Sequence, residues 1–280
     1  MAAKPSASDD DLSETRSALL DARDRTKRSG QALIFETQTV TPRARGWGLW
    51  PRSLAKRLRG HIQRLGPLFE QRLEYRAGQY VTLVRPDGLT RSYSIASQSA
   101  SNRDCLELHV RIFPNGQMSS WLSSHRALRT EVAIRGPLGD CFYVPGNPAQ
   151  PLLLVGTGTG LAPLWGILND ALESGHSGPI ELWHGARTAA GLYLVRELET
   201  LASTHRQFTY RRSILQGPAD ACIEVGDLDA ALLGSATSFE GRRVFLCGDP
   251  NLVRQVKRKV FLKGASMREI HADAFVGSAT

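Results

Sequence analysis

The sequence lacks any closely spaced pair of cysteines. Its 280 residues include four cysteines, Cys105, Cys141, Cys222 and Cys247. No two of them stand in a C-x-x-C or ferredoxin-type spacing, so an iron–sulfur cluster held by this chain is not expected. A disulfide framework is not expected either at this chain length and cysteine density.

Long apolar runs are also missing. No stretch approaches the roughly 18 apolar residues of a membrane span, and the polar, acidic N-terminus has no apolar core of a signal peptide. These absences predict a cytoplasmic protein. The formal net charge of +8 favours acidic partners, nucleic acid or an anionic membrane surface. No nucleic-acid recognition motif accompanies the charge, so nucleic-acid binding is not expected.

The first half of the chain has the pattern of an antiparallel β domain. Residues 1–30 are rich in Ser, Asp, Arg and Ala and predict a flexible tail. Within 31–147, the stretch 105–112 alternates apolar and polar residues, and 78–84 and 131–137 read similarly. Pro and Gly recur between these short strands. The pattern predicts a small antiparallel β-barrel.

From 148 to 280 the sequence pattern predicts strands that alternate with helices. The run "LLLVG" (152–156) is continuously apolar, as expected for a buried parallel strand. Further strands are expected at 180–185, 208–212 and 243–248, and helices at 161–173, 191–203 and 250–262. This order predicts an α/β doubly wound parallel sheet. The predicted architecture is therefore two domains, with a boundary near 147–151.

The stretch "GTGTGLAP" (156–163) lies between the apolar strand and the helix that follows. Glycines there let the backbone approach phosphate oxygens, and the helix N-terminus supplies free N–H donors. The alternative is a plain glycine-rich turn.

The stretch "RSYSIAS" (91–97) is the second candidate. Arg91 and Tyr93 point to the same side of an extended strand. The guanidinium can pair with phosphate, the ring offers an apolar face to a planar group, and Ser94 offers a hydroxyl at its edge. The alternative is an ordinary barrel strand with one solvent-exposed face. Farther on, "NGQMSSWL" (115–122) reads as a turn and a short helix that offers donors to a second phosphate, or simply as a helix cap.

Taken in order, these stretches resemble the ferredoxin–NADP(H) reductase superfamily, specifically the flavin reductase components of bacterial oxygenases. The resemblance covers about residues 65–276. It is carried by "YRAGQYVTL" (75–83), "RSYSIAS", "GQMSSWL", "GPLGDCFY" (136–143), "GTGTGLAP", "HGARTAAGLYL" (184–194), "FLCGDPNLV" (245–253) and "IHADAF" (270–275). It implies an FAD-binding barrel followed by an NAD(P)H-binding domain, and hence an FAD-dependent NAD(P)H oxidoreductase.

The resemblance also implies roles for individual residues. Ser94 would lie near the reactive flavin nitrogen and Cys247 beside the nicotinamide, as the two catalytic positions. The flavin would be bound by Arg91, Tyr93, Ser94, Gly116, Gln117, Met118 and Ser119, with Phe275 near its ring. The nicotinamide dinucleotide would be held by Gly156, Thr157, Gly158, Gly160, Arg187, Cys247, Gly248 and Asp249. NADH is favoured over NADPH, because Leu215 and Gln216 stand where NADPH-using relatives often have a Ser-Arg pair.

This sequence differs from the family in two features that affect which electron-transfer partner is expected. A ferredoxin domain's cysteine cluster is absent, so the electrons would pass to a separate iron–sulfur or haem protein; the alternative is a non-catalytic interaction subunit. The segment 41–66 is basic and has no acidic residue, and its apolar residues predict a helix over 52–65. Such a helix suits an acidic electron-transfer protein docking at 43–64, an anionic membrane surface, or packing on the barrel.

Overall fold

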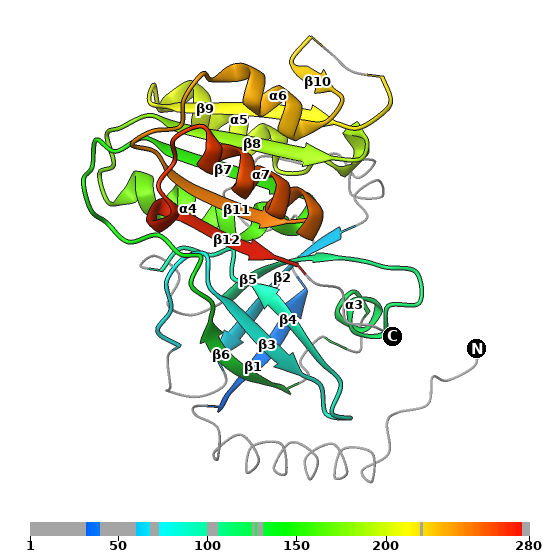
Figure 1. Ribbon diagram of the computed structural model, residues 1–280. Coiled ribbons are helices and arrows are strands. Elements are labelled where there is room, and N and C mark those ends of the chain that lie inside the picture. The colour runs from blue at the N-terminus through cyan, green and yellow to red at the C-terminus, as the bar shows by residue number, and fades with distance from the viewer. Residues whose placement is uncertain are drawn as a thin grey trace, which may run out of the picture.

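The computed structural model describes residues 73–99, 106–124, 127, 131–218 and 221–275, together with the backbone of two strands at 32–39 and 60–67. The predicted tail at 1–30 and most of the basic segment lie outside the described residues. The described parts form two β-sheets, drawn one above the other in Figure 1. The predicted limits of the two domains stay predictions.

The first sheet is antiparallel and has the strand order β4-β3-β6-β1-β2-β5. Its strands are β1 (Ala32–Thr39), β2 (Gly60–Pro67), β3 (Tyr80–Val84), β4 (Thr90–Ser94), β5 (Leu106–Arg111) and β6 (Glu131–Leu138). A bridge between Ile95 and Leu108 joins the two edge strands and closes the sheet into a barrel. Helix α3 (Gln117–Leu122) packs Met118 and Leu122 into the barrel's apolar core. The predicted antiparallel barrel is confirmed.

The helix predicted over 52–65 is wrong for its second half. Residues 60–67 form strand β2, which pairs with β1 on one side and β5 on the other. Ile62 and Leu65 have helical spacing, but backbone pairing with two neighbouring strands outweighs that local preference. Gly60, a poor helix former, begins the strand. Residues 51–59 lie outside the described residues.

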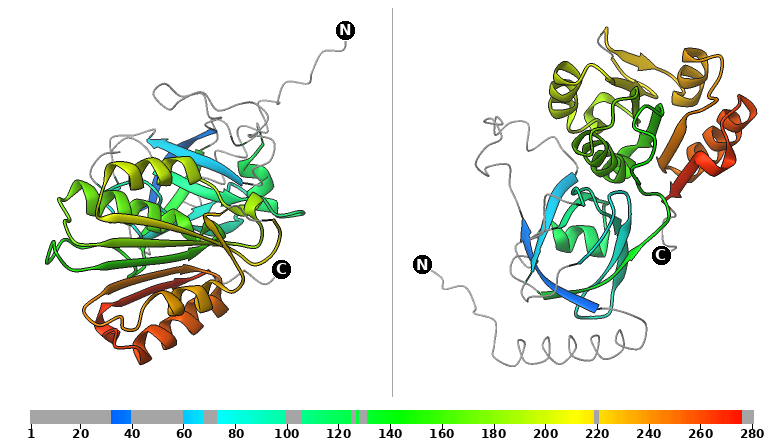
Figure 2. Two further views of the ribbon diagram at one scale, coloured as in Figure 1. Left: turned by 90° about the horizontal axis from the view of Figure 1, so that it is seen from above. Right: turned by 90° about the vertical axis from the view of Figure 1, so that its left-hand side faces the viewer.

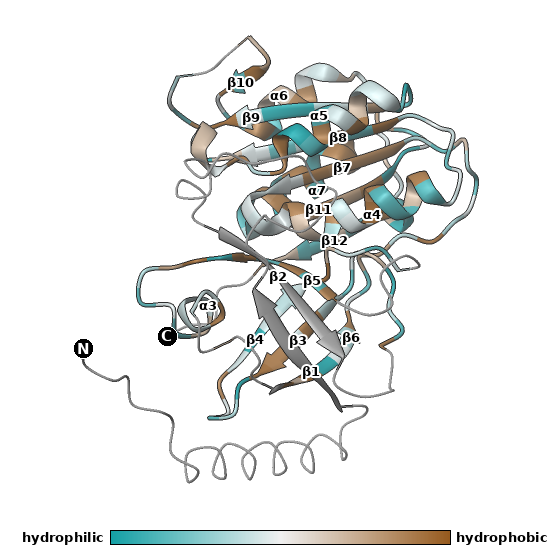
Figure 3. Ribbon diagram, turned by 180° about the vertical axis from the view of Figure 1, so that it is seen from behind, coloured by the Kyte–Doolittle hydropathy of each residue, from teal (hydrophilic) through white to brown (hydrophobic). Residues whose placement is uncertain are grey.

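The second sheet is parallel, with the strand order β10-β9-β8-β7-β11-β12. Its strands are β7 (Leu152–Thr157), β8 (Ile180–Ala186), β9 (Phe208–Ile214), β10 (Ile223–Val225), β11 (Arg243–Gly248) and β12 (Ile270–Ala274). Residues 152–156 of β7 are buried, and Figure 3 shows the central strands largely in the hydrophobic colour. The chain runs outward from β7 in one direction and then returns to β11. The topological switch point, where such sheets bind ligands, therefore lies between β7 and β11.

Helices cover both faces of this sheet, as Figure 2 shows. Helices α4 (Leu161–Glu173) and α5 (Val195–Thr204) pack on one face, and α6 (Leu228–Ser235) and α7 (Pro250–Leu262) pack on the other. The predicted doubly wound α/β architecture is confirmed. Short 3-10 turns occur at Gly158–Gly160, Ala189–Gly191 and Met267–Glu269.

One buried cluster joins the two domains, and we call this contact the seam. Ala96, Cys141 and Tyr143, which lie close to the barrel in sequence, pack in the same apolar cluster as α4. Helix α4 comes close because Gly166 has no side chain: a Cβ there would lie 3.1 Å from the carbonyl oxygen of Ala96. The amide of Ser99 also donates to the Asp170 carboxylate on α4 at 3.0 Å.

Candidate functional site

The predicted nucleotide-binding residues gather at the carboxyl ends of β7 and β11. In the parallel register Cys247 lies opposite Gly156, so the ends of the two strands carry Gly156 and Thr157 beside Cys247 and Gly248. This is the switch point of the sheet. Parallel pairing thus brings together two motifs that are far apart in the sequence.

Most glycines of the loop have no space for a side chain because the protein packs against them. A Cβ on Gly160 would lie 2.3 Å from the carbonyl oxygen of Cys247, and one on Gly156 would lie 2.6 Å from Leu164. Both glycines therefore let α4 begin directly against the ends of the strands. A close backbone approach of this kind is needed whether or not a ligand binds.

Gly158 differs from these two glycines. Its φ angle is +54°, a region that favours glycine, and a Cβ there would approach no atom closer than 3.8 Å. The atom at 3.8 Å is a guanidinium nitrogen of Arg111, which comes from the end of barrel strand β5. No ion-pair partner of Arg111 occurs among the described residues. The open space above Gly158 is bordered by a guanidinium that lies over the Phe113 ring and has no acidic partner among the described residues, and such a space fits a phosphate group.

Arg111 was missed by the sequence reasoning. It stands in the alternating strand "CLELHVRI", where its charge reads as one more residue of a solvent-facing strand. Only the packing of the barrel against the second domain brings it to the glycine loop.

Asp249 and Thr157 are hydrogen-bonded to each other beside the glycine loop. The Asp249 carboxylate caps α7 by accepting from the amides of Asn251 and Leu252, at 2.9 and 3.0 Å. The Asp249 amide donates to the Thr157 hydroxyl at 3.1 Å. The Thr157 hydroxyl therefore links the ends of β7 and β11, and the Asp249 side chain fixes the start of α7. Their predicted contact with the nucleotide stays a prediction.

Arg187 lies where the loops after β8 and β9 meet. The amide of Gln216 donates to the Arg187 carbonyl at 3.1 Å, and Leu215 is 56% exposed beside it. Arg211 pairs with Glu181, and Arg212 with Glu199. Arg187 is exposed and has no ion-pair partner among the described residues.

The barrel presents Arg91, Tyr93 and Ser94 on strand β4. Arg91 is half-buried, and its guanidinium donates to the backbone carbonyl of Thr90 at 2.7 Å. Burial raises the pKa of the Tyr93 phenol, with the Arg91 charge opposing the shift. Arg91 has no acidic partner among the described residues, so an anionic group fits beside it.

The residues predicted around the second phosphate form a tight turn. The Ser119 hydroxyl accepts from the Phe113 amide and donates to the Gly116 carbonyl, both at 3.2 Å. Met118 is buried in the barrel core, and the Gln117 carbonyl accepts from Arg85. Within the described chain, Ser119 therefore has a structural role, and its contact with a phosphate stays a prediction.

Both predicted catalytic positions lie at the seam. Ser94 is buried at the end of β4 and hydrogen-bonds the carboxyl group of Asp273, which lies on β12 opposite Cys247. Burial raises the pKa of the Asp273 carboxyl, and the hydrogen bond from Ser94 opposes the shift. Phe275 follows β12, and its amide donates to the Gly248 carbonyl at 2.8 Å. Asp273 was missed as a site residue, although "IHADAF" was one of the recognised motifs.

A second polar contact crosses the seam nearby. His109 on β5 shares a hydrogen bond with the Tyr193 hydroxyl at 2.9 Å, and Tyr193 packs edge-on against His184. Burial lowers the pKa of His184 to about 3, so this imidazole is neutral at physiological pH. Its Nδ1 contacts the Tyr210 hydroxyl at 3.0 Å. This cluster holds β5, and hence Arg111, against the domain of the parallel sheet.

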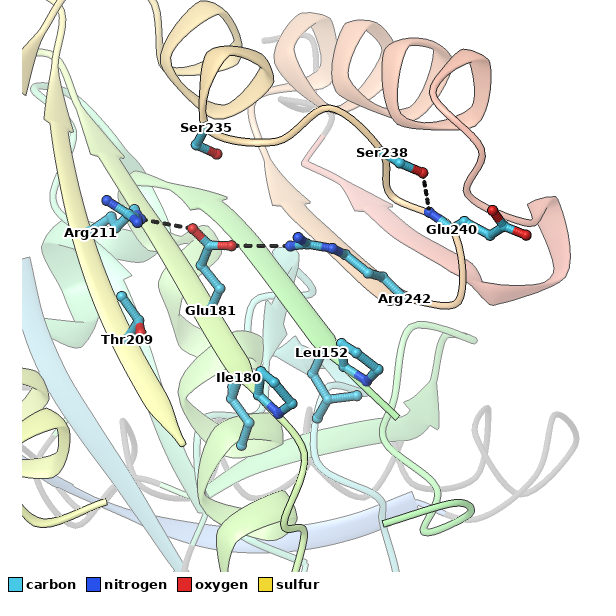
Figure 4. Close-up of a pocket in the computed structure, with 11 residues that line it drawn as sticks. Leu152, Ile180, Glu181, Thr209, Arg211, Ser235, Ser238, Glu240 and Arg242 are labelled. Atoms are coloured by element: carbon cyan, nitrogen blue, oxygen red, sulfur yellow. Dashed lines mark hydrogen bonds and ion pairs between the residues drawn. The ribbon is translucent and has the colours of Figure 1, made fainter. Parts of the chain in front are cut away.

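A pocket of about 450 Å³ lies elsewhere, toward the amino ends of β7 and β8 (Figure 4). Its central Glu181 carboxylate accepts from Arg211 at 2.8 Å and from Arg242 at 3.1 Å. Glu240 also lines the pocket, so its two carboxylates balance its two guanidinium groups. It lies at the sheet edge opposite the switch point, and we assign it no role in nucleotide binding.

Comparison with known proteins identifies both domains. Residues 66–143 match the oxidoreductase FAD-binding domain family, and residues 154–258 match the oxidoreductase NAD-binding domain family. The chain therefore belongs to the ferredoxin–NADP(H) reductase superfamily of oxidoreductases, with an FAD-binding domain and an NAD-binding domain.

Within that class, similar proteins include reductase components of oxygenase systems. It is 34% identical over 214 residues to the ferredoxin–NAD(P)+ reductase component of a naphthalene 1,2-dioxygenase system from Pseudomonas putida. That match covers 76% of this chain and 64% of the relative. It is 36% identical over 208 residues to the reductase subunit of an aromatic O-demethylase from Amycolatopsis, covering 72% and 61%. The chain thus spans less than two thirds of the length of these relatives.

Solved structures agree with this assignment. The crystal structure of an Amycolatopsis cytochrome P450 reductase superposes with a TM-score of 0.76 at 31% identity, covering 89% of this chain and 71% of that one. The ferredoxin reductase of a carbazole 1,9a-dioxygenase has a TM-score of 0.69 at 19% identity, covering 89% and 71%, and shares the fold.

The described helices include none that is both long and apolar enough to cross a membrane.

Proposed function

We propose that this chain oxidises NAD(P)H and passes the electrons through FAD to a separate iron–sulfur or haem protein. The observation that carries the proposal is the meeting of Ser94, Cys247 and Asp273 at the seam. A residue predicted beside the flavin and one predicted beside the nicotinamide lie next to a shared carboxyl group. A cytoplasmic location stays a prediction.

The chain's own residues would bind, orient and shield the cofactors. FAD, when bound, would supply two-electron acceptance from NAD(P)H and single-electron release. Arg91 would pair with its pyrophosphate, and Tyr93 would pack on its ring. Arg111 and the open face of Gly158 would hold the phosphates of the dinucleotide. Asp273 would help to position the Ser94 hydroxyl; burial raises the pKa of its carboxyl group, and the hydrogen bond from Ser94 opposes that shift.

Reconstitution with FAD tests this proposal against a non-catalytic interaction subunit. The full chain, incubated with FAD and desalted, should be yellow, and NADH should bleach the flavin absorbance under anaerobic conditions. Turnover of NADH with ferricyanide, an artificial acceptor, should follow. A protein that binds FAD but is not bleached by NADH or NADPH would instead be an interaction subunit. A protein that stays colourless would contradict the flavin site.

The identity of the acceptor is a separate proposal. Some similar proteins are reductase components of dioxygenase systems, and the basic segment at 43–64 is a candidate docking surface for an acidic protein. Its expected helix is absent over 60–65, where the strand β2 lies. The proposal therefore rests on the charge of the segment.

Charge reversal of Lys56, Arg57 and Arg59 tests this docking surface. Delivery of electrons to the natural acceptor should slow at low salt, where electrostatic steering is strongest. NADH-to-ferricyanide turnover should not change, because none of the predicted cofactor-binding residues belongs to this segment. The matched control reverses Arg254 and Arg258, two exposed residues of α7. Equal acceptor kinetics in all three proteins would rule out docking at this segment.

Coenzyme choice should favour NADH. Arg211 and Arg212 are already paired with glutamates, so Arg187 is the cation left to meet a 2′-phosphate near Leu215 and Gln216. We expect kcat/KM to be higher for NADH. Arg187→Ala should lower the residual NADPH activity while leaving the NADH value within about twofold, a change below 0.5 kcal/mol. A tenfold preference of the unmodified protein for NADPH would contradict the expectation.

A further inference from the structure

Two buried cysteines face each other across the seam. The Sγ atoms of Cys141 and Cys247 lie 3.7 Å apart, and both residues are free thiols that are almost completely buried. Cys141 follows the last barrel strand, whereas Cys247 is the last residue but one of β11, at the switch point. The two residues are 106 positions apart in the sequence, so only the docking of the two domains brings them together.

The geometry points to a site of oxidative modification: we propose that hydrogen peroxide converts Cys141 and Cys247 into a disulfide that links the two domains and stops NADH oxidation. The loss of activity rests on the proposed function, because it assumes that the nicotinamide binds beside Cys247. Formation of the disulfide does not.

Forming the bond requires only a small movement. A disulfide has an S–S length of about 2.05 Å, so the two sulfurs must approach by less than 2 Å. No bulky side chain needs to leave, since the thiols are already neighbours. No group of three or more His, Cys, Asp or Glu suited to a metal occurs in the described part of the chain. The pair is therefore better explained as a redox pair than as part of a metal site.

The reaction balances with peroxide as the only oxidant. One thiolate attacks a peroxide oxygen and becomes a sulfenic acid, and the other oxygen leaves as water after taking up a proton. The second thiol then attacks the sulfenic sulfur, forming the S–S bond and releasing a second water. Two thiols and one peroxide thus give one disulfide and two waters, and the sulfurs supply the two electrons.

Burial sets the rate of this reaction. Loss of solvent and the neighbouring Cys141 thiol raise the pKa of the Cys247 thiol well above its usual value, so its thiolate is scarce. Oxidation should therefore be slow at neutral pH and faster as pH rises. Bound nucleotide should slow it further, because the nicotinamide would cover Cys247.

The consequence for activity follows from the position of Cys247. When Cys247 is bonded to Cys141, its Sγ atom moves toward the barrel side of the seam. It then leaves the position that it has near the end of β11 in the reduced protein. A nicotinamide positioned against that sulfur would lose its support. The link would also fix the two domains together and constrain the unfolded chain, so the oxidised protein should be more resistant to heat.

The experiment treats the FAD-loaded full chain with hydrogen peroxide and measures bond, stability and activity separately. Peptide mapping without reductant should find residues 141 and 247 in one cross-linked pair, with the mass of two hydrogens lost. The temperature of unfolding should rise. NADH-to-ferricyanide turnover should fall at least about tenfold, and dithiothreitol should restore it.

Matched variants separate this site from other oxidation. Cys141→Ala and Cys141→Ser should turn over NADH like the unmodified protein, form no cross-link and resist inactivation that is reversible by dithiothreitol. Cys222→Ala, which removes an exposed cysteine, should behave like the unmodified protein. NAD+ at saturating concentration should slow the cross-linking.

Three outcomes would overturn the inference: a Cys247 sulfinic acid without a cross-link, a cross-link that leaves turnover intact, or equal reversible inactivation of the Cys141 variants. In each case NADH still reduces the untreated protein, so the proposed function stands. The opposite result, a cross-link in a protein that NADH never reduces, would support the disulfide and refute the reductase.

Discussion

Arg91→Ala should lose most of its FAD during purification while folding normally. Arg91 is half-buried on β4, and its described hydrogen bond goes to the backbone of Thr90. A charge-assisted contact with the flavin pyrophosphate is worth roughly 1.5–3 kcal/mol. Its loss should raise the Kd for FAD by about 10- to 150-fold. Titration of the apoprotein with FAD, followed by fluorescence, measures this directly.

Tyr93→Ala should have a comparable effect through lost packing. Ser92→Ala is the matched control, because Ser92 lies between these residues on the opposite face of β4 and hydrogen-bonds Thr82. It should keep its FAD. The thermal unfolding of all the apoproteins should agree within a few degrees. Full flavin occupancy in both the Arg91 and Tyr93 variants would show that this strand does not bind FAD.

The second large effect is expected at Arg111. Arg111→Glu should raise the KM for NADH by about tenfold or more, since it replaces a charge-assisted phosphate contact with a repulsion. The FAD content should be unchanged, because Arg111 approaches the glycine loop of the other domain. Steady-state assays with ferricyanide give KM, and the flavin spectrum gives occupancy.

Arg135→Glu provides the charge-matched control. Arg135 is exposed on β6, which lies between β3 and β1 and away from β5 in the sheet order. It should leave the KM for NADH unchanged. If both variants shift the KM equally, the effect is one of net charge, and Arg111 has no specific contact with the nucleotide.

The sequence predicts the regular parts of the fold well. The helices expected at 161–173 and 250–262 have those bounds in the structure, and so does the strand at 243–248. These elements have strong local signals: amphipathic spacing, Pro250 at the start of a helix, or a continuous apolar run. The short strand β10 and helix α6 were not anticipated, because 223–235 has no clear periodicity.

Strand β2 shows where local patterns mislead. Its residues carry a weak helical spacing, and they become a strand because β1 and β5 lie on either side. That pairing depends on chain segments on both sides of it in the sequence. A short stretch of sequence around 60–67 therefore does not show that these residues pair with β1 and β5.

The site shows the same division. The motifs predict Arg91 and the glycine loop as cofactor-binding residues, because each is a local arrangement of residue types. Three contacts could not be predicted from the sequence: Arg111 with Gly158, Asp273 with Ser94, and Cys141 with Cys247. Each joins residues from both domains, so each depends on how the barrel docks against α4 and β12.

The absence of a side chain at Gly166 has a consequence for how coenzyme enters. Because α4 lies directly on the backbone of Ala96, the barrel and the parallel sheet share one buried apolar cluster. Swinging the domains apart would hydrate that cluster, at about 25 cal/mol for each Å² of apolar surface exposed. Separation of the two domains is therefore disfavoured. If the nicotinamide binds beside Cys247 as proposed, we expect it to enter by local movement of side chains such as Phe275, which is half-buried after β12 and whose amide donates to the Gly248 carbonyl.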